Sequence, residues 1–453
     1  MNKIFLSFLI VSAMSCQPGG NKNDKTIHLI TLDPGHFHAA LVQKAMYIDV
    51  DSVVRIYAPE GNDLQLHLGR IDAFNKRTDN PTHWKEEVYT GNDYFEKMLA
   101  EKKGNVVVLA GNNQKKTEYI LKSLEAGFNV LADKPMVITS AGFETLKKAF
   151  ETAKQKDLLL YDIMTERFEI TSILQRDLSM TPEVFGVLEK GTTGNPAMVI
   201  ESGHSFYKYV SGNVLTRPAW FMDAAQQGEG ITDVTTHLVD LVQWMGFPEQ
   251  SLDYQNEINV ETAKRWPTIM TLSQFKTITR LDSFPSYFKK NLLNDTTLQV
   301  WSNGEIHYQV RGVQAKVAVK WDYQGPDGND THYSIMRGSK ANLVIRQGME
   351  QQYKPVLYIE PVVMDLAYEK NLLEQFKKIQ ATYPGIELKK MDKGWEVIIP
   401  DKYKEGHESH FARVTENYLN YFKNHNMPAW EVPNMLAKYY TTTKALEIAL
   451  KTK

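Results

Sequence analysis

The sequence predicts two domains: first an α/β domain on a mostly parallel, doubly wound sheet, then an α+β domain with an open, mainly antiparallel sheet. Three observations support this prediction. Short apolar runs alternate with helical patterns up to residue 167, which is typical of repeated strand–helix–strand units. Beyond residue 197, strand-like segments of alternating polarity follow one another. A chain of 453 residues is also long enough for two cores.

The N-terminus has the features of an export signal. An apolar stretch, Ile4 to Met14, is too short to cross a bilayer. It ends in a run, Ala13 to Cys16, that resembles a bacterial lipobox, in which the cysteine receives lipid. We therefore predict a lipoprotein signal peptide over residues 1–16, lipidation at Cys16 and a polar tether over residues 17–25. The anchored protein would face the periplasm, with the outer membrane as its expected location. An ordinary cleaved signal peptide is the alternative.

Charge and cysteine content restrict the function. The 52 basic and 54 acidic residues leave a formal net charge of −2, which gives no electrostatic case for nucleic-acid binding. Cys16 is the only cysteine, so no disulfide can form within the chain. Aromatic residues make up 11% of the chain. Such a content suits sugar binding, although core packing is the commoner use of aromatic side chains.

A strand, a turn and a helix open the first domain between residues 28 and 42. This is the place of a dinucleotide-binding glycine loop, whose pattern G-x-G-x-x-G here falls on Asp33, Gly35 and His38. Only the middle glycine is kept, the one that lets the backbone approach a pyrophosphate. A carboxylate at Asp33 would repel phosphate. His36 and His38 could contact a ligand at this sheet edge, or could be turn residues that face water.

The second strand is expected over residues 53–58. In dinucleotide-binding domains a carboxylate at the end of this strand binds the ribose hydroxyls, and the candidate here is Glu60. Residues 61–90 then show a weak, polar pattern, which we interpret as an insertion.

The clearest pattern in the first domain runs from Asn105 to Met136. Asn105 to Ala110 is a continuous apolar run with β-branched residues at its centre, typical of a strand buried on both faces. A helix that ends at Gly127 follows, and then a short apolar strand that leads into Asp133-Lys134-Pro135. Ligands of open α/β sheets bind at the carboxyl ends of the strands. Lys134 is therefore our first candidate for chemistry.

The remaining elements complete the two domains. A helix over residues 143–156 and a strand over 158–163 end the first domain, which we delimit as residues 26–167. The second domain, residues 168–453, opens with a helical segment over 168–190. Further helices are expected over residues 234–245, 407–423 and 433–451. Its strands are expected over residues 197–201, 268–279, 297–301, 305–310, 315–321, 332–336 and 341–346.

Two residues at the start of the 234–245 helix could form a catalytic pair. Asp233 and His237 are four apart, so we expect them to share one face and to meet. A carboxylate that orients an imidazole makes a tuned general base. The alternative is an N-cap aspartate and a histidine that only packs. Gly228 and Gly230, before the helix, permit close approach of a ligand.

Together these motifs resemble one family. The run Asp133-Lys134-Pro135, and the spacing Gly-x-Gly-x-x-Asp-x-x-x-His-x-x-Asp from Gly228 to Asp240, are similar to motifs of the glucose–fructose oxidoreductases and inositol dehydrogenases, the Gfo/Idh/MocA family. The lysine motif of this family is usually Glu-Lys-Pro, and its helix motif usually has glycine where Thr235 stands here. Asn113 is kept from the family's Thr-Pro-Asn loop, whereas Lys116 stands at the usual histidine position.

The resemblance implies a Rossmann domain that binds NAD or NADP, packed against a substrate domain with the active site between them. His237 would take a hydroxyl proton while hydride leaves the same carbon, and Lys134 would stabilise the developing alkoxide. Asp233 would hold His237 in position and favour its charged form. The C-terminal segment around His407 and Trp430 resembles a "putative oxidoreductase C-terminal" subgroup that is common among lipoproteins.

Further candidates for ligand contacts follow from their positions in the chain. On the cofactor side the candidates are Gly35, His36, His38, Glu60, Asn113, Asp133 and Lys134, with Lys116 as a weaker one. On the sugar side they are His204, Tyr207, Arg217 and Trp220, which precede the motif helix. His407 and His410 suit capping and surface roles better than metal binding, so we predict no metal site.

The predicted function is an NAD(P)-dependent oxidoreductase for a sugar or glycoside. Because free nicotinamide nucleotides are scarce outside the cytoplasm, we expect a tightly bound cofactor that is recycled within each turnover. The degraded glycine loop leaves two alternatives open: a lyase or epimerase for keto-sugars, and a non-catalytic carbohydrate-binding lipoprotein. The expected partners are a small sugar and, through the lipid anchor alone, a membrane. The open sheet would also permit a homo-oligomer.

Overall fold

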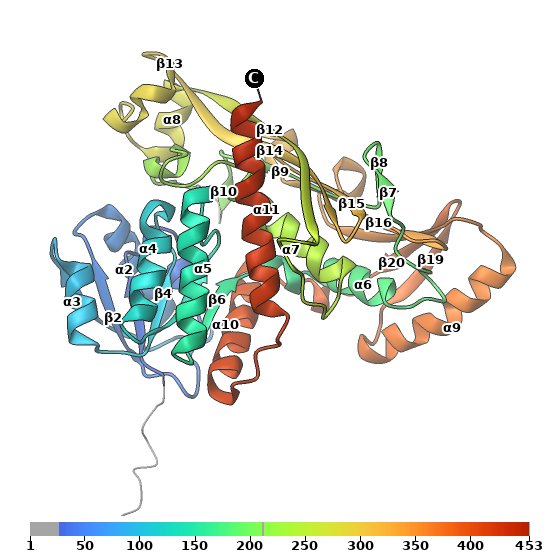
Figure 1. The fold of residues 1–453 in the computed structure, drawn as a ribbon, viewed down its shortest axis with the longest axis horizontal. Coiled ribbons are helices and arrows are strands. Elements are labelled where there is room, and N and C mark those ends of the chain that lie inside the picture. The colour runs from blue at the N-terminus through green and yellow to red at the C-terminus, as the bar shows by residue number, and fades with distance from the viewer. Residues whose placement is uncertain (1–26, 211–212, 453) are drawn as a thin grey trace, which may run out of the picture.

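The computed structural model describes residues 27–210 and 213–452. The predicted signal peptide, the tether and Cys16 lie outside these residues. Two sheets, each with a hydrophobic core, form the two domains. In Figure 1 the first domain lies to the left of the long C-terminal helix α11 (Glu431–Lys451), and the larger sheet extends from above the first domain past the helix to the right. No helix within the described ranges combines the length and the hydropathy that a membrane span requires.

The first domain contains a six-stranded sheet in the order β3-β2-β1-β4-β5-β6, and all of its neighbouring strands are parallel. Its strands are β1 (Leu29–Leu32), β2 (Val53–Ala58), β3 (Lys85–Thr90), β4 (Val106–Leu109), β5 (Asn129–Asp133) and β6 (Leu160–Ile163). The strand order reverses between β1 and β4. In doubly wound sheets the ligand crevice opens at this reversal, outside the carboxyl ends of the strands. The predicted doubly wound α/β domain is confirmed.

Helices connect these strands: α1 (His38–Leu41), α2 (Asn62–Lys76), α3 (Tyr94–Glu101), α4 (Asn113–Glu125) and α5 (Ser140–Gln155). The interpretation of residues 61–90 as an insertion is wrong, because this segment forms α2 and β3. β3 is the edge strand of the sheet, and most of its side chains are exposed or half-buried. An edge strand needs little apolar sequence, so it lacks the signal that identifies β4.

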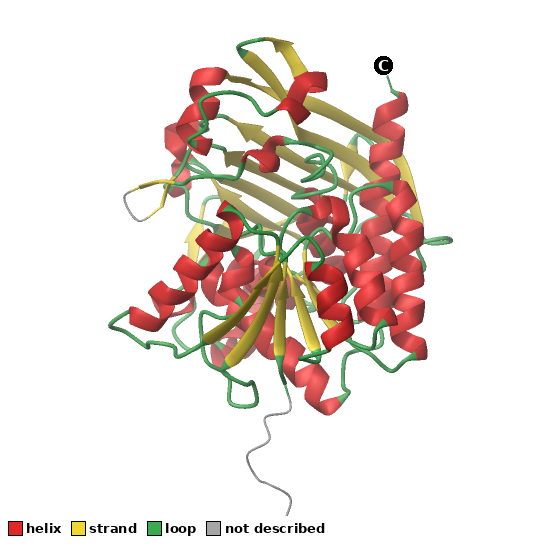
Figure 2. Cartoon of the chain, turned by 90° about the vertical axis from the view of Figure 1, so that its left-hand side faces the viewer, coloured by secondary structure: helices red, strands yellow, loops and turns green. Residues whose placement is uncertain are grey.

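The second domain contains a ten-stranded, open sheet, whose main path runs β12-β14-β15-β9-β16-β17-β18-β20-β19. Its neighbours are antiparallel except for β15 and β9, which run parallel. Figure 2 shows this sheet crossing above the smaller parallel one. Its strands are β9 (Met198–Ser205), β12 (Ile258–Thr271), β13 (Leu292–Asn294), β14 (Thr297–Val310), β15 (Val313–Asp322), β16 (Thr331–Arg337), β17 (Ala341–Gln347), β18 (Val356–Pro361), β19 (Glu387–Met391) and β20 (Gly394–Ile398). The predicted mainly antiparallel sheet is confirmed.

Local chemistry corrects one predicted strand. Residues 268–279 are not one strand, because β12 ends at Thr271 and the helix α8 (Leu272–Thr279) begins there. The Thr271 hydroxyl accepts a hydrogen bond from the Gln274 amide, and the Gln274 side chain accepts one from the Thr271 amide. This reciprocal cap fixes the start of a helix in a sequence whose composition suits a strand.

The other helices of the second half are α6 (Ile170–Ser179), α7 (Thr235–Gly246), α9 (Leu366–Thr382) and α10 (His407–Asn424). α6 covers only part of the helical segment that we predicted over residues 168–190. We assigned the C-terminal helices to the second domain, yet Phe411, Val414 and Tyr418 of α10 belong to the first core. α11 packs against α5 of the first domain and against α7 and β12 of the second. The C-terminal helices therefore join the two domains.

A buried group of ionised side chains also joins the domains, and we call it the structural charge network: Asp162, Arg167, Asp240, Glu431 and Lys438. Arg167 contacts both oxygens of Asp240, at 2.6 and 2.7 Å, and lies 3.0 Å from Glu431. Lys438 lies 2.7 Å from Asp162 and 2.8 Å from Asp240. Burial alone would raise the pKa of Asp240, but Arg167 and Lys438 hold it well below the usual value. Each member of the network thus has a partner of opposite charge.

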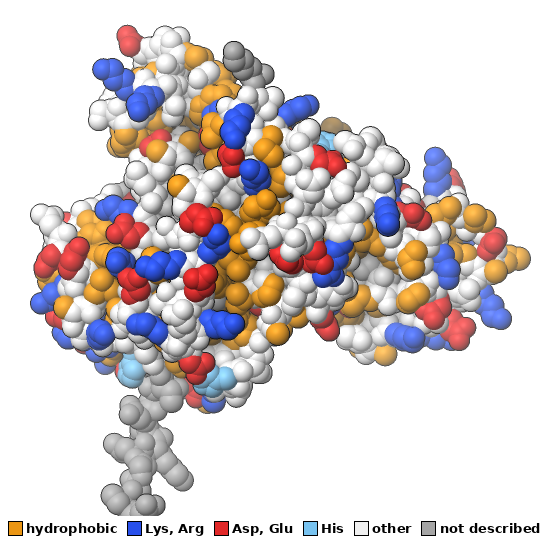
Figure 3. Space-filling view, viewed as in Figure 1, with side chains coloured by type: hydrophobic (Ala, Val, Ile, Leu, Met, Phe, Trp, Pro, Cys, Tyr) orange, Lys and Arg blue, Asp and Glu red, His pale blue; other side chains and the backbone are white. Residues whose placement is uncertain are grey.

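The surface carries both signs of charge. Over the face shown in Figure 3, Lys and Arg side chains are interspersed with Asp and Glu. This distribution agrees with the formal net charge of −2.

Candidate active site

The carboxyl end of β5 meets the loop before α7 through an ion pair. Lys134 follows β5 directly, and its Nζ lies 2.7 Å from Oδ1 of Asp233. The other oxygen of Asp233 accepts a hydrogen bond from Nε2 of Gln227 at 2.9 Å. Both members of the pair are nearly buried, with side-chain exposures of 11% and 7%. The structure therefore brings together the predicted lysine and aspartate from the two domains.

His237 is not paired with Asp233 as we predicted. α7 begins at Thr235, so Asp233 lies in the turn before the helix, and its two oxygens are taken by Lys134 and Gln227. The Nδ1 atom of His237 is buried and has no hydrogen-bond partner within the described chain. Burial, and then the charge of Lys134, hold the pKa of His237 well below the usual value. This lowered pKa favours the neutral imidazole, which is the opposite of the charged form that we predicted.

The glycine loop is better suited to an anion than its sequence suggests. Asp33 adopts a φ of +49°, the left-handed conformation that a glycine would otherwise supply. Its Oδ2 lies 3.5 Å from the hydroxyl of Tyr94 and 3.4 Å from that of Tyr119. Burial raises the pKa of Asp33. The two tyrosine hydroxyls are thus placed to hydrogen-bond the carboxylate that we expected to repel phosphate.

Gly35 faces an aromatic side chain of the second domain. A Cβ at Gly35 would lie 3.0 Å from the ring of Trp220 and 3.2 Å from Oδ2 of Asp63. Nε1 of Trp220 donates a hydrogen bond to the same Asp63 oxygen at 2.9 Å. Trp220 therefore fills the approach to the backbone at Gly35. Trp220, predicted as a sugar contact, lies at the cofactor loop.

The carboxylate that faces this loop is Asp63 and not the predicted Glu60. Glu60 follows β2 and is exposed, whereas Asp63 lies in the first turn of α2 and is half-buried. An acidic residue in a first helical turn after β2 was a signal that could have identified it. Asp63 is therefore the better placed candidate for a ribose contact.

Asn113 and Lys116 hold the loop between β4 and α4. Nδ2 of Asn113 donates to the carbonyl of Gln227 at 2.6 Å, which ties this loop to the second domain. The buried Nζ of Lys116 donates to the carbonyl of Asp133 at 3.0 Å, and burial lowers the pKa of Lys116 to about 8. Lys116 thus supports the segment that carries Lys134.

His36, His38 and Asp133 form a compact cluster at the same sheet edge. Nδ1 of His38 lies 2.9 Å, and Nδ1 of His36 3.3 Å, from Oδ2 of Asp133. Burial alone would raise the pKa of Asp133, but His38, His36 and Lys116 hold it well below the usual value. The three donor atoms lie within 4.8 Å of one another, close enough to share a metal ion. Their predicted contacts with the cofactor stay predictions.

A polar cavity of about 390 Å³ lies beside His237. Its titratable lining residues are Glu166, Glu169, His204, His237, Asp330, His332, Glu405, His407 and His410. Among the four predicted sugar contacts, only His204 lines this cavity. Sequence reasoning missed Glu166, whose pKa is raised to about 7 by burial and then by Glu169. It follows β6, so its place at the carboxyl edge of the sheet was a usable signal.

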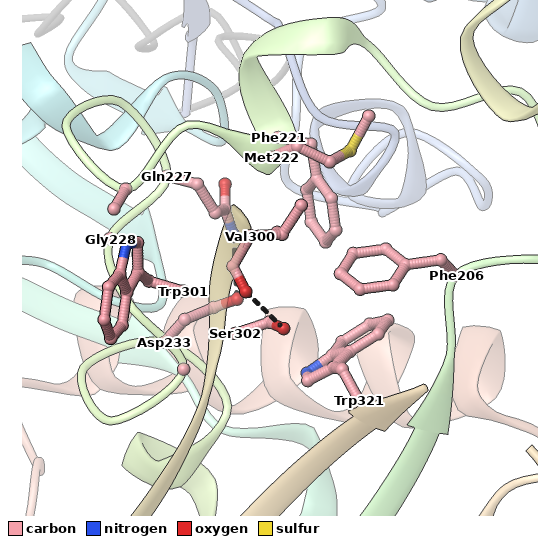
Figure 4. A pocket seen from close by; sticks show the side chains of 12 residues that line it. Phe206, Phe221, Met222, Gln227, Gly228, Asp233, Val300, Trp301, Ser302 and Trp321 are labelled. Atoms are coloured by element: carbon pink, nitrogen blue, oxygen red, sulfur yellow. Dashed lines mark hydrogen bonds between the residues drawn. The ribbon is translucent and has the colours of Figure 1, made fainter. Parts of the chain in front are cut away.

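A second, much smaller cavity of about 20 Å³ lies on the Asp233 side, with room for one water molecule. Figure 4 shows Phe206, Phe221 and Trp321 facing Asp233 across it. The predicted sugar contact Arg217 stacks on Phe221 and Trp321, with its guanidinium carbon 4.9 and 5.4 Å from the ring centres.

Arg217 and Tyr207 are both engaged in contacts within their own loop. Arg217 also donates to the carbonyls of Ser205 and Phe206, and burial lowers its pKa to about 10. The hydroxyl of Tyr207 donates to that of Tyr209 at 2.9 Å. These two predicted sugar contacts therefore bind other residues of their own loop, and neither lines the 390 Å³ cavity.

Known oxidoreductases resemble this chain in sequence and in fold. Residues 35–161 match a family model described as "Oxidoreductase family, NAD-binding Rossmann fold", and residues 174–450 match one described as "Putative oxidoreductase C terminal domain". A crystal structure of a "putative oxidoreductase" from Parabacteroides merdae is 56% identical in sequence, with a TM-score of 0.93 over 95% of this chain and 99% of that one. The chain belongs to the Gfo/Idh/MocA oxidoreductase family. The first domain of this oxidoreductase is thus the family's NAD-binding Rossmann fold.

More distant structures share the fold. A 3-ketoreductase from Actinomadura kijaniata, in complex with NADP, is 13% identical, with a TM-score of 0.56 over 93% of this chain and 97% of that one. A levoglucosan dehydrogenase in complex with NADH and levoglucosan is 11% identical, with a TM-score of 0.59 over 94% of this chain and 98% of that one. No curated protein matches the chain. At these identities the similarity shows the architecture of the oxidoreductase and not its substrate.

Proposed function

We propose that this oxidoreductase transfers hydride between a sugar or glycoside and a tightly bound NAD or NADP. The observation that carries the proposal is the Lys134–Asp233 pair across the two domains, close to the His237 imidazole that lines the 390 Å³ cavity. The 390 Å³ cavity beside His237 is large enough for a sugar and is lined by polar side chains. The 3-ketoreductase and the levoglucosan dehydrogenase share the architecture of this chain, and a carbohydrate substrate is our proposal by analogy with them.

The roles of the three residues follow from their contacts. The imidazole of His237, which lines the 390 Å³ cavity and whose pKa is lowered by burial, accepts the hydroxyl proton of the substrate. Lys134 places its ammonium where negative charge develops on the substrate oxygen. Asp233 fixes the Lys134 ammonium and leaves the imidazole free. A bound nicotinamide would supply the hydride acceptor or donor.

The residues that would hold the cofactor lie on the first domain. The backbone at Gly35 would approach the pyrophosphate, Asp63 would bind ribose hydroxyls, and Asn113 and Lys134 would border the nicotinamide end. Trp220 now packs on Gly35, so its indole must move when a pyrophosphate lies there. This contact also favours a second candidate function: a lyase or epimerase for keto-sugars that uses Lys134 and His237 without redox chemistry.

One experiment separates the two candidates. The purified full chain is denatured, and the released nucleotides are measured by mass spectrometry and by absorbance. We expect about one NAD or NADP per chain, and absorbance changes at the reduced nicotinamide band when the intact protein meets a panel of sugars. Turnover of a keto-sugar by protein free of nucleotide would overturn the redox proposal and support the lyase or epimerase.

A matched pair of glycine variants tests the placement of the cofactor. Gly35→Val puts a branched side chain against Trp220, so the nucleotide content should fall. Gly194→Ala is the control, because no atom lies within 4 Å of the added Cβ. An unchanged nucleotide content in Gly35→Val would show that the cofactor does not lie at this loop.

We further propose that the chain is an exported lipoprotein anchored through Cys16. A tightly bound cofactor suits such a location, because free nicotinamide nucleotides are scarce outside the cytoplasm. Metabolic labelling with a fatty acid should mark the wild-type protein and leave Cys16→Ala unlabelled. Equal labelling of both proteins, or labelling of neither, would overturn the lipid anchor.

A further inference from the structure

We propose that His36, His38 and Asp133 bind one divalent transition-metal ion of the zinc class. The site lies at the carboxyl edge of the parallel sheet, directly before Lys134. This inference departs from our prediction that the chain has no metal site. It also goes beyond the proposed function, since hydride transfer with Lys134 and His237 does not require it.

The distances from Asp133 to the two imidazoles are close to those between the ligands of a tetrahedral ion. Zinc binds imidazole nitrogen and carboxylate oxygen at roughly 2.0–2.2 Å, which places neighbouring tetrahedral donors about 3.3 Å apart. Oδ2 of Asp133 lies 2.9 Å from Nδ1 of His38 and 3.3 Å from Nδ1 of His36. Two imidazoles and a carboxylate leave at least one position open, as in catalytic zinc sites.

The donors are shielded from solvent. His38 is 6% exposed, and Nδ1 of His36 and Nδ1 of His38 both face Oδ2 of Asp133. Neutral imidazole and carboxylate are the metal-binding forms of these side chains. In addition, Oδ1 of Asp133, a residue that is only 3% exposed, has no hydrogen-bond partner within the described residues. A buried carboxylate oxygen without a donor calls for a water molecule, an ion or another ligand that satisfies it.

The nearby cations do not compete for the donor atoms. The ammonium of Lys134 is paired with Asp233, and that of Lys116 donates to the backbone carbonyl of Asp133. On the other side of the cluster, the ring of His407 lies 5.2 Å from that of His38 between centroids, and His407 lines the 390 Å³ cavity. The cluster therefore adjoins the cavity, and the open position could take water or an oxygen of a substrate.

The test measures metal binding without sugar or nucleotide, so its outcome does not depend on the proposed function. The full chain is stripped with a chelator and titrated with Zn²⁺ against a chromogenic competitor. We expect one Zn²⁺ per chain, and binding that is weakened by about 100-fold or more in His38→Asn and in Asp133→Asn. The Co²⁺-loaded protein should show the visible absorption of a four-coordinate site, and the same variants should lose it.

Matched variants protect the result against a folding defect. His36 is partly exposed, so His36→Gln tests the site with less disturbance of the core. His28→Asn is the control, since Nδ1 of His28 also lies near a carboxylate, 3.1 Å from Asp51, but outside the cluster. Zn²⁺ should raise the thermal midpoint of the wild type and of His28→Asn, and not that of His36→Gln. Absence of stoichiometric Zn²⁺ binding, or binding retained by His36→Gln and Asp133→Asn, would overturn the proposal.

Discussion

The interface between the two domains contains two groups of buried charged and ionisable side chains that differ in how completely they are paired. In the structural charge network, Arg167 and Lys438 contact three carboxylates at 3.0 Å or less. The second group, which we call the cleft cluster, consists of His36, His38, Asp133, Lys134, Asp233 and His237. In the cleft cluster, Nδ1 of His237 and Oδ1 of Asp133 have no partner among the described residues.

This difference separates a structural role from a functional one. A buried ionised group is tolerated only when it is paired and hydrogen-bonded, so a fully paired network can hold an interface by itself. A buried polar atom without a partner costs free energy unless a ligand, a water molecule or an ion satisfies it. Asp240 illustrates the point: it belongs to the motif that suggested the family, yet its contacts with Arg167 and Lys438 are structural.

The largest expected effect is on stability, in the network. Lys438→Met removes a fully buried cation, which takes from Asp162 its ion pair among the described residues and leaves Asp240 with Arg167 alone. Breaking a buried ion pair on one side costs about 3–5 kcal/mol, so we expect the free energy of unfolding to fall by that amount. Denaturant unfolding measures it. Protein that remains folded should still bind nucleotide, because Lys438 lies outside the cleft cluster.

The same helix provides a matched control. Lys444 is also on α11, and it pairs with Glu447 at 3.1 Å on the surface, where its side chain is 39% exposed. Lys444→Met should therefore change the free energy of unfolding by less than about 1 kcal/mol. Equal losses in the two variants would mean that the network does not hold the domains together.

The next effect is on turnover, in the cleft cluster. Lys134→Met removes the cation that stabilises the developing alkoxide, so we expect the turnover number to fall by about 10²–10³-fold. Thermal unfolding should change much less than in Lys438→Met. The measurement is the rate of reduction of the bound nucleotide after mixing with the sugar that the wild type oxidises.

The exposed lysine Lys122, which pairs with Glu125 on α4, serves as the control for this change. Lys122→Met should leave the rate unchanged. Retention of the wild-type rate in Lys134→Met would remove Lys134 from the reaction, and with it the main argument for the site.

The sequence was sufficient for those parts of the site that are local in the chain. Lys134, Asp233 and His237 were identified because each lies in a short motif next to a strand end or a helix start. Their pairing was not predictable, because the start of α7 at Thr235 decides which side chains Asp233 can reach. The contacts that cross the domains depend on packing that no local pattern encodes, as with Trp220 on Gly35.

The fold shows the same limit. The parallel sheet was predictable through β4 and β5, whose continuous apolar runs reflect burial on both faces. The edge strand β3 was missed because most of its side chains are exposed or half-buried. The helix α8 was also missed, because its composition suits a strand and only the cap at Thr271 distinguishes it.

A smaller effect concerns pH. In the cleft cluster the pKa of His38 and that of His237 are well below the usual value, mainly because both are buried. The folded state thus binds fewer protons than the unfolded state. The stability that these imidazoles contribute is therefore complete above about pH 6.5, and the free energy of unfolding decreases as the pH falls below that value. Each such imidazole contributes a slope of about 1.4 kcal/mol per pH unit.

Denaturant unfolding between pH 7.5 and 5.5 measures this slope. His237→Asn should reduce the slope of the free energy of unfolding against pH by the contribution of one imidazole, about 1.4 kcal/mol per pH unit. Lys438→Met should lower the free energy of unfolding without changing this slope. An unchanged slope in His237→Asn would indicate that the pKa of His237 is the same in the folded and the unfolded protein, and it would contradict the lowered pKa on which the role of His237 as proton acceptor rests.

The smallest expected effect is on cofactor affinity. It shows whether a ligand can replace the contacts that hold the two domains together beside the cleft cluster. Trp220 bridges the domains by packing on Gly35 and donating a hydrogen bond to Asp63. Cofactor binding must displace the Trp220 indole, and this displacement weakens the affinity. When only a fraction of the molecules has the binding site open, a variant that raises this fraction lowers the apparent Kd in proportion. We expect Trp220→Ala to bind NAD or NADP up to about tenfold more tightly, as measured by calorimetry on nucleotide-free protein.

Trp244→Ala is the control, since Trp244 packs on Arg176, away from Gly35. Weaker cofactor binding in Trp220→Ala would instead make Trp220 part of the cofactor site, and the contact with Gly35 would then be a preformed wall of that site.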